Sequence, residues 1–374
     1  MKRRKKRTAE KSKIEYERAW LKLYALIRRA EESGLGDPVE ILNYIQEHEI
    51  RDFFSKKHFY DIHKKIGLPV RPKQPPEDRL AVQDGDYIIA PIDHTAANSI
   101  IDLLAQFLAE TEKQIDYVVE FGSGIGRNLL ILADKLEPKL RANILFYACE
   151  FTDAGRKACA KLRELKSDLR MSIEYFDYYD PDFSFLGKKK NILLFTRHSI
   201  EQIPILDRAF FEGILKASNQ CFCYHAEPVG WQFDKELVKW RRLWQSNKSR
   251  RSQSSVRRRL QKVKRKIYKL DRYIFERFDI GFLDASRQFG LDIDRRDIGR
   301  SSKVSLNAAR WSAALDYNTN LVCLLKDLEK EGLIRIDFEQ VNFYGDNPFN
   351  PSTIVAWHKA GVLNYRVGVS CRAM

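Results

Sequence analysis

Apolar and polar positions divide the chain into a helical N-terminal region and a longer region with a different rhythm. Trp20, Leu23, Tyr24 and Ile27 recur at helical spacing, which predicts a helix over residues 9–32. Further helices are expected over residues 38–66 and 94–110, with a stiff proline-rich linker at 72–76 between them. We therefore expect a helical region before the rest of the fold.

From residue 117 the pattern changes to short apolar strands that alternate with helices. The expected strands are 117–121, 144–149, 172–176, 191–195, 221–225, 333–343 and 352–357. The expected helices between them are 128–136, 153–165, 206–217 and 318–331. Strands and helices that alternate at this spacing form a parallel sheet with helices on both faces. The sequence thus predicts an α/β fold.

Residues 231–316 interrupt this alternation. Between Leu260 and Ile274 the apolar residues follow a 3-4-3-4 spacing, which predicts one apolar stripe on a helix otherwise coated with Lys and Arg. We expect a basic helical insertion or lid that enters after the fifth strand. The predicted parts are an N-terminal helical region with a basic tail (1–85), an α/β core (86–230 and 317–374) and the insertion (231–316).

Formal charge is concentrated at two places. The net charge is +15, of which residues 1–13 carry +7 and residues 235–277 carry +14, so the remainder carries −6. Basic attachments on a mildly acidic body indicate an anionic partner: nucleic acid, a phospholipid surface or an anionic substrate. No run of about 18 apolar residues predicts a membrane span, and no apolar segment follows the basic start as in a signal peptide. We expect a cytoplasmic protein that can lie peripherally on the inner face of the membrane.

The clearest motif lies where the first strand of the α/β region meets the next helix: Glu120-Phe121-Gly122-Ser123-Gly124-Ile125-Gly126-Arg127-Asn128. Glycines there let the backbone approach a ligand, and the helix offers free N–H groups to an anion. A Walker A loop is excluded because the Gly-Lys-Ser/Thr ending is missing. The dinucleotide pattern G-x-G-x-x-G would need a glycine at Arg127.

The pattern that is present, acidic-x-G-x-G-x-G, resembles motif I of the class I S-adenosylmethionine-dependent methyltransferases. The resemblance covers about residues 115–230 and 318–360. It implies a Rossmann-like, mostly parallel seven-stranded sheet that binds S-adenosylmethionine. Glu120 would then neutralise the methionine ammonium, and the backbone at Gly122 and Gly124 would pass under the methionine part.

Two later carboxylates agree with the resemblance. Glu150 ends the second strand, where members of the family have a carboxylate that binds the two ribose hydroxyls. Asp177 follows the third strand, where members of the family have an acidic residue that faces the adenine amino group. The cofactor-binding residues that the resemblance implies are Glu120, Gly122, Ser123, Gly124, Gly126, Glu150, Asp177, Tyr178 and Thr196. Simpler interpretations stay open: an ordinary nucleotide-binding turn, a helix N-cap at Glu150 and a solvated carboxylate at Asp177.

Methyl transfer to a hydroxyl needs an oriented nucleophile and a base that removes its proton. His198 and His225 lie at the ends of the fourth and fifth strands, on the rim where open α/β sheets bind ligands. A neutral histidine suits the role of the base. We predict His198, then Glu201, then His225 as catalytic residues. For each histidine, a hydrogen-bonded rim residue without catalytic duty is the alternative.

Missing motifs narrow the predicted reaction. The fourth strand is not followed by the Asn/Asp-Pro-Pro-aromatic motif of many amino-group methyltransferases, and residues 199–202 hold one glutamate rather than the two of protein arginine methyltransferases. Asn347-Pro348-Phe349 lies in the late hairpin turn, so we interpret it as turn chemistry. No metal-ligand set is apparent, so no metal is predicted. By elimination, we expect a metal-independent O-methyltransferase that acts on a glycan or small-molecule hydroxyl.

The basic insertion has three candidate partners. Residues 235–277 could hold the phosphate backbone of RNA, with Trp240 and Trp244 stacking on bases, or could lie on an anionic membrane surface. The helix at 260–274 could instead pair two copies into a homodimer. The alternative functions are therefore an RNA methyltransferase, or a non-catalytic nucleic-acid- or membrane-binding module on a Rossmann-like scaffold.

Overall fold

The computed structural model describes residues 2–92, 97–111, 114–187, 190–251, 271, 291–301 and 303–361. Its N-terminal elements are α1 (Lys2–Glu32), α2 (Pro38–Phe54), α3 (Lys57–Lys65), β1 (Asp78–Gln83), β2 (Asp86–Pro91) and α4 (Ala97–Glu110). The later strands are β3 (Tyr117–Phe121), β4 (Leu145–Glu150), β5 (Met171–Tyr175), β6 (Lys190–Arg197), β7 (Ser218–Glu227), β8 (Ile334–Gly345) and β9 (Ser352–Lys359). The later helices are α5 (Arg127–Lys135), α6 (Pro138–Asn143), α7 (Asp153–Glu164), α8 (Ala209–Ala217), α9 (Lys235–Arg251), α11 (Val304–Leu315) and α12 (Leu321–Lys330). Short 3₁₀ turns are η1 (Ser184–Leu186), η2 (Ile200–Gln202), η3 (Gly230–Phe233) and η5 (Arg295–Asp297).

All seven expected strands join one sheet, and two further strands extend it. Among the described residues the sheet has nine strands in the order β2-β1-β8-β9-β7-β6-β3-β4-β5. Neighbours from β5 to β7 are parallel, whereas β9 is antiparallel to both β7 and β8. The predicted α/β fold with a mostly parallel core is therefore confirmed, but the predicted number of seven strands is too small.

The two additional strands form a hairpin. Asp84 and Gly85 connect β1 to β2 with φ values of +49° and +86°, and a type I′ hairpin turn needs positive φ at both central residues. Val82 pairs with Gly345, which attaches the hairpin to β8. Asp-Gly between two apolar runs is the signal that could have predicted it. The domain boundary that we predicted after residue 85 falls inside this hairpin.

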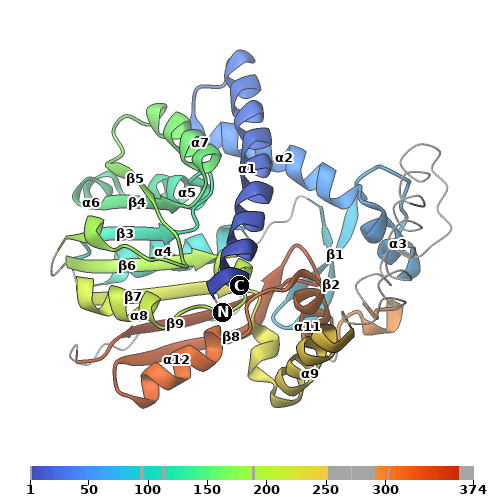
Figure 1. Ribbon diagram of the computed structural model, residues 1–374. Coiled ribbons are helices and arrows are strands. Elements are labelled where there is room, and N and C mark those ends of the chain that lie inside the picture. Colours follow the sequence, from blue (N-terminus) through green and yellow to red (C-terminus); the bar gives the residue numbers. More distant parts are fainter. Residues whose placement is uncertain are drawn as a thin grey trace.

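Helices cover both faces of the sheet (Figure 1). Successive residues of β3 point to opposite faces: Val118 packs in the cluster formed with α4, α5 and α7, and Val119 in the cluster formed with α8 and α12. The parallel strands end at one edge of the sheet, where ligands of open α/β sheets bind. Helix α1, dark blue in Figure 1, packs beside α7 and crosses this edge.

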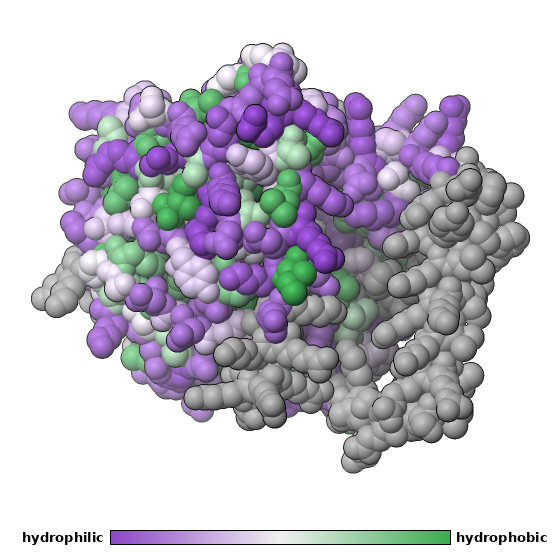
Figure 2. All heavy atoms as spheres, turned by 45° about the horizontal axis from the view of Figure 1, so that its top comes forward, coloured by the Kyte–Doolittle hydropathy of each residue, from purple (hydrophilic) through white to green (hydrophobic). Residues whose placement is uncertain are grey.

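The surface carries few large apolar groups. The face turned to the viewer in Figure 2 is mainly hydrophilic, with apolar residues in small scattered groups. On α1, for example, Ile14 and Leu21 are about half exposed. Single exposed apolar residues of this kind are normal for a protein surface. Within the described part of the chain, no helix is long and apolar enough to cross a membrane.

The basic insertion starts as α9. Apart from Asp271, the apolar stripe at 260–274 and the dimer contact predicted from it lie outside the described residues. The same holds for most of the basic run at 235–277, of which the structure describes 235–251 and one further residue. The chain returns at residue 291 and continues through η5 into α11.

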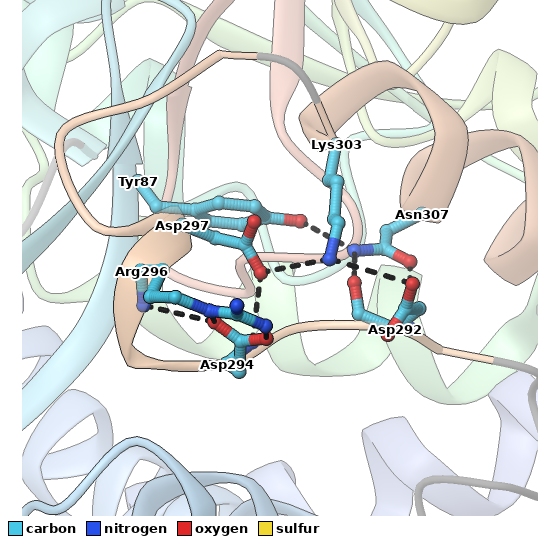
Figure 3. A network of polar contacts seen from close by, with 7 residues as sticks. All are labelled: Tyr87, Asp292, Asp294, Arg296, Asp297, Lys303 and Asn307. Carbon is cyan, nitrogen blue, oxygen red and sulfur yellow. Dashed lines mark hydrogen bonds and ion pairs between the residues drawn. The ribbon is translucent and has the colours of Figure 1, made fainter.

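This returning segment is fixed to the hairpin through Tyr87 (Figure 3). Ile298 forms a parallel bridge with Tyr87, and the Gly299 N–H donates to the Tyr87 carbonyl at 2.7 Å. The Asn307 amide, fully buried, donates to the Tyr87 hydroxyl and to the Asp292 carbonyl, each at 2.9 Å, and accepts from the Asp292 N–H at 3.0 Å. Around this contact lie Asp294, Arg296, Asp297 and Lys303.

Replacing Asn307 should therefore detach the segment. In Asn307→Ala, three hydrogen bonds are lost and buried groups lose their partners, so we expect a loss of about 2–3 kcal/mol of unfolding free energy. The urea midpoint measures this loss. Arg296→Ala is the matched control, because that side chain is 85% exposed and its ion pair with Asp294 is local. Equal midpoints for the two variants would contradict the anchoring role of Asn307.

Candidate functional site

Three positions of the turn between β3 and α5, residues 122–126, have room only for glycine. Gly122, Gly124 and Gly126 have φ values of +73°, +56° and +78°, a region that other residues rarely adopt. A Cβ at each would lie too close to a neighbouring side chain, at 2.3 Å from Ser199 Cβ, 2.8 Å from Trp20 Cζ2 and 2.5 Å from Cys159 Sγ respectively. We call this segment the glycine turn.

A pocket of about 320 Å³, the turn pocket, lies between the glycine turn, the ends of β4 and β6, and helix α1. Six predicted site residues line it: Gly122, Glu150, Asp177, Tyr178, His198 and Glu201. The sequence analysis did not assign the residues that α1 adds, which are Ser12, Tyr16 and Trp20. It also did not assign Arg197, although Arg197 directly precedes His198 at the end of β6.

Beside the glycine turn, the side-chain amide of Asn128 is hydrogen-bonded to both Glu120 and Arg197. Asn128 Nδ2 donates to Glu120 Oε1 at 2.5 Å, and Asn128 Oδ1 accepts from Arg197 Nη1 at 2.9 Å. Glu120 is buried, and among the described residues its Oε2 has no hydrogen-bond partner. Burial raises the pKa of Glu120 to about 8, against the effects of Asn128 and Arg197. This pair can bind a ligand group that carries both an ammonium and a carboxylate.

Glu150 both lines the pocket and holds the local backbone. Its Oε2 accepts the Gly124 N–H at 2.9 Å, and its Oε1 accepts the Thr152 N–H at 2.9 Å and the Thr152 hydroxyl at 2.6 Å. Thr152 is the residue that caps α7, since its Oγ1 accepts the Gly155 N–H. The N-cap is therefore Thr152 rather than Glu150, which holds this cap in place and also has a carboxylate in the pocket wall.

Asp177 and Tyr178 lie at the far wall of the turn pocket. Asp177 Oδ1 accepts the Tyr179 N–H at 2.8 Å, and burial raises the pKa of Asp177 despite that bond. The Tyr178 hydroxyl donates to the Phe121 carbonyl at 3.1 Å and lies 2.9 Å from Ser199 Oγ. Tyr178 thus ties this wall to the end of β3.

A second pocket of about 360 Å³ adjoins the first, and the two share Arg197 and His198. We call it the loop pocket, because the loop between β8 and β9 contributes Asp346, Asn347 and Asn350 to its wall. Its aromatic lining residues are Phe53, Trp311, Tyr317, Phe343 and Tyr344. The segment that we interpreted as a simple turn therefore also forms a pocket wall.

His198 stands between the two pockets. Its φ of +51° is unusual for a residue other than glycine, and such backbone strain is concentrated at functional sites. Nδ1 lies 3.3 Å from Glu201 Oε2, and Nε2 lies 2.8 Å from Ser352 Oγ in the loop-pocket wall. Burial acts to lower the pKa of His198, but the carboxylates of Glu201 and Glu227 outweigh it and raise this pKa above its ordinary value.

Glu227 shapes the loop that carries His198 and Glu201. Its carboxylate is fully buried and accepts the N–H groups of Ser199 and Ile200 at 3.1 Å and of Glu201 at 3.0 Å. Burial, with the nearby charge of Glu201, raises the pKa of Glu227 to about 7. Because three backbone N–H groups of the loop after β6 donate to this one side chain, Glu227 fixes the position of that loop.

His225 does not belong to either pocket. It is fully buried, its Nδ1 lies 2.9 Å from Thr196 Oγ1, and burial lowers its pKa to about 3. Glu120, Ser123, Gly124, Gly126 and Thr196 also lie outside both pocket walls. Thr196 and His225 are fully buried and contact each other, so neither side chain faces a pocket. Among the described residues no group of three or more His, Cys, Asp or Glu is placed to hold a metal.

Comparison with known proteins gives structural neighbours only. No family model matches the chain, and no curated protein matches it in sequence. Matching solved structures include DszA carbon methyltransferase (11% identity, 35% of this chain, 35% of that chain, TM-score 0.28) and a putative sarcosine dimethylglycine methyltransferase from Galdieria sulphuraria (11%, 35%, 48%, 0.28). A putative O-methyltransferase from Klebsiella pneumoniae matches over 72% of this chain and 83% of that chain, with 12% identity and a TM-score of 0.34. The match spans about a third of the length of DszA carbon methyltransferase and about half of the length of the Galdieria sulphuraria protein.

The strand order identifies the fold. From β5 to β7 the strands are parallel, β9 lies antiparallel between β7 and β8, and the glycine turn follows the central strand β3. This arrangement fits a Rossmann-like fold, as the resemblance found in motif I implies. The hairpin β1–β2 is an addition to it.

The opposite environments of the two histidines can be measured directly. We expect His198 to titrate above pH 6.5 and His225 to stay neutral down to about pH 4, as NMR of the imidazole C–H groups would report. In Glu201→Gln the attraction to the imidazolium is lost and burial dominates, so the pKa of His198 should fall. An unchanged His198 titration in that variant would contradict the pairing.

Proposed function

We propose that the protein is an S-adenosylmethionine-dependent methyltransferase that binds the methyl donor in the turn pocket and a hydroxyl-bearing acceptor in the loop pocket. The observation that carries this proposal is the common wall of the two pockets, formed by Arg197 and His198. A group-transfer enzyme needs two ligands that meet at one place, with a base beside that place.

Residues at and beside the turn pocket have the chemistry that the donor needs. Glu120 does not line the pocket, but it has a buried carboxylate oxygen without a partner among the described residues, and Arg197 in the pocket wall lies one amide away from it, so the two suit the ammonium and carboxylate of the methionine part. Glu150 and Asp177 line the pocket with carboxylates, which can accept hydrogen bonds from ribose hydroxyls and an adenine amino group. When bound, the cofactor supplies a methyl group on a positively charged sulfur.

His198 is the proposed general base. With Nδ1–H directed to Glu201, Nε2 is the acceptor nitrogen, and in this structure it accepts a hydrogen bond from the Ser352 hydroxyl at 2.8 Å. An acceptor hydroxyl at the same distance would lose its proton to Nε2 as the oxygen bonds to the methyl carbon. The bound cofactor would supply the methyl group and would keep the electron pair of its carbon–sulfur bond.

The lining of the loop pocket suits a glycan or small-molecule hydroxyl. Flat aromatic side chains such as Trp311 and Tyr344 contact the apolar faces of rings, while Asp346, Asn347 and Asn350 offer polar groups to hydroxyls. At about 360 Å³ the pocket accommodates a molecule of the size of one or two sugar rings. We therefore keep an O-methyltransferase with a small polar acceptor as the first proposal.

RNA is the second candidate acceptor, and α9 favours it. On α9 the ring centroids of Trp240 and Trp244 are 5.6 Å apart, and Trp244 is 41% exposed. Exposed Lys and Arg side chains on the same helix can hold phosphates while the indoles stack on bases. Transfer of labelled methyl to a cell extract, with aliquots treated with RNase or protease, separates the candidates: a label that resists both treatments supports the first, and RNase-sensitive label supports RNA.

Binding of the donor tests the proposal most simply. In Gly124→Arg, the new side chain would meet Trp20 and the turn would be strained, so we expect calorimetry to detect no S-adenosylmethionine binding. Gly332→Arg is the matched control, because Gly332 has a φ of +73° but open space around its Cβ position, outside the site. Wild-type affinity in Gly124→Arg would refute the placement of the donor.

The base is tested by kinetics. In His198→Gln we expect a drop in kcat of about 10²–10⁴-fold, the usual contribution of a positioned base. The folded protein should still bind the donor, because the ammonium and adenosine partners are untouched. If kcat changed less than threefold, His198 would not be the base.

A further inference from the structure

One face of α1 covers the turn pocket in its first half and packs into the core in its second half. Lys13 and Glu17 are four residues apart, as are Tyr16 and Trp20, and the two pairs are offset by three, so all four lie on one side of the helix. Tyr16 and Trp20 are in the pocket wall, and Trp20 packs directly on the glycine turn at Gly124. The outer wall of the pocket is thus not part of the α/β sheet.

The second half of α1 is firmly attached. Leu23 and Ile27 are buried in the core cluster that includes α5 and α7. Near its end, Glu31 forms an ion pair with Lys161 of α7 at 2.9 Å. Removing this half from the core would expose large apolar side chains, which opposes any movement of α1 as a whole.

Among the described side chains of the first half, Tyr16 lies in the pocket wall, and Lys13 and Glu17 make polar contacts at the pocket rim. Glu17 Oε1 accepts the Ala154 N–H in the first turn of α7 at 3.1 Å, where the helix end favours a negative charge. Lys13 Nζ lies 4.9 Å from the centre of the Phe151 ring and 5.8 Å from that of Tyr175. Such contacts break at much lower cost than the burial of an apolar helix face. We call Lys13 and Glu17 the latch.

We propose that the first half of α1 is a gate for the cofactor: it swings or frays away from the α7 start, with the buried second half as its fixed base, and closes over the bound ligand. This inference rests on the proposed function, because it takes the turn pocket as the donor site. Lys13 of the latch lies over the ring of Phe151, which is itself a pocket residue, so closure and cofactor contact take place at the same rim. The gate should therefore limit both entry and release of the cofactor.

The test uses the full-length chain with Glu17→Ala or Lys13→Ala, and Arg18→Ala as the matched control on the exposed side of the same helix turn. The first readout needs no ligand. Hydrogen exchange of peptides covering residues 10–22 should speed up in both latch variants and stay at the wild-type rate in the control. Unchanged exchange in the latch variants would overturn the latch.

The second readout is stopped-flow binding of S-adenosylhomocysteine, with the tryptophan fluorescence of the protein, to which Trp20 in the pocket wall contributes, as signal. A gate that opens more often raises the association and dissociation rate constants together, and we expect an increase of about fivefold or more in each latch variant. A rise in the dissociation rate alone would mean that the latch residues only touch the ligand, which overturns the gate. If wild-type protein with normal exchange bound no S-adenosylhomocysteine, the proposed function would fail, and the gate with it.

Discussion

The close packing around the glycine turn is the constraint on which the site depends. Gly122 fits against Ser199 of the β6 loop and Gly126 against Cys159 of α7, so the turn fixes the distance between three elements of the α/β core. Because the backbone lies this close, the Gly124 N–H reaches Glu150 at the end of β4. A larger residue at any of these glycines would move the strand ends apart and with them both walls of the turn pocket.

Charges buried next to this turn have a complementary arrangement. Glu227 holds the loop that carries Glu201 and His198, while Asn128 links Glu120 to Arg197. Burying a carboxylate lowers the stability of the fold, and burial has raised the pKa values of Glu120 and Glu227. Groups with such shifted pKa values are concentrated at functional sites. In the proposed reaction a cationic ligand balances the carboxylate of Glu120, and His198 has the orientation that a base requires.

Much of this could be predicted from the sequence because strand ends and glycine spacing are local signals. Motif I located Gly122, the later positions of the resemblance located Glu150 and Asp177, and the strand rhythm located His198, all of which line the turn pocket. The sequence ranked His198 first but kept His225 as a candidate, since each lies at the predicted end of a strand and only packing decides which one faces a ligand. Nor could it place α1: the stripe of Trp20 and Leu23 predicts an apolar helix face, but not the surface on which this face lies.

A crystal structure of the protein with S-adenosylhomocysteine tests the central claim most directly. The account predicts the ligand in the turn pocket, with its amino-acid end between Glu120 and Arg197, its adenosine end toward Glu150 and Asp177, and Trp20 against it. An empty turn pocket at a saturating ligand concentration, or a ligand bound elsewhere on the chain, would contradict it.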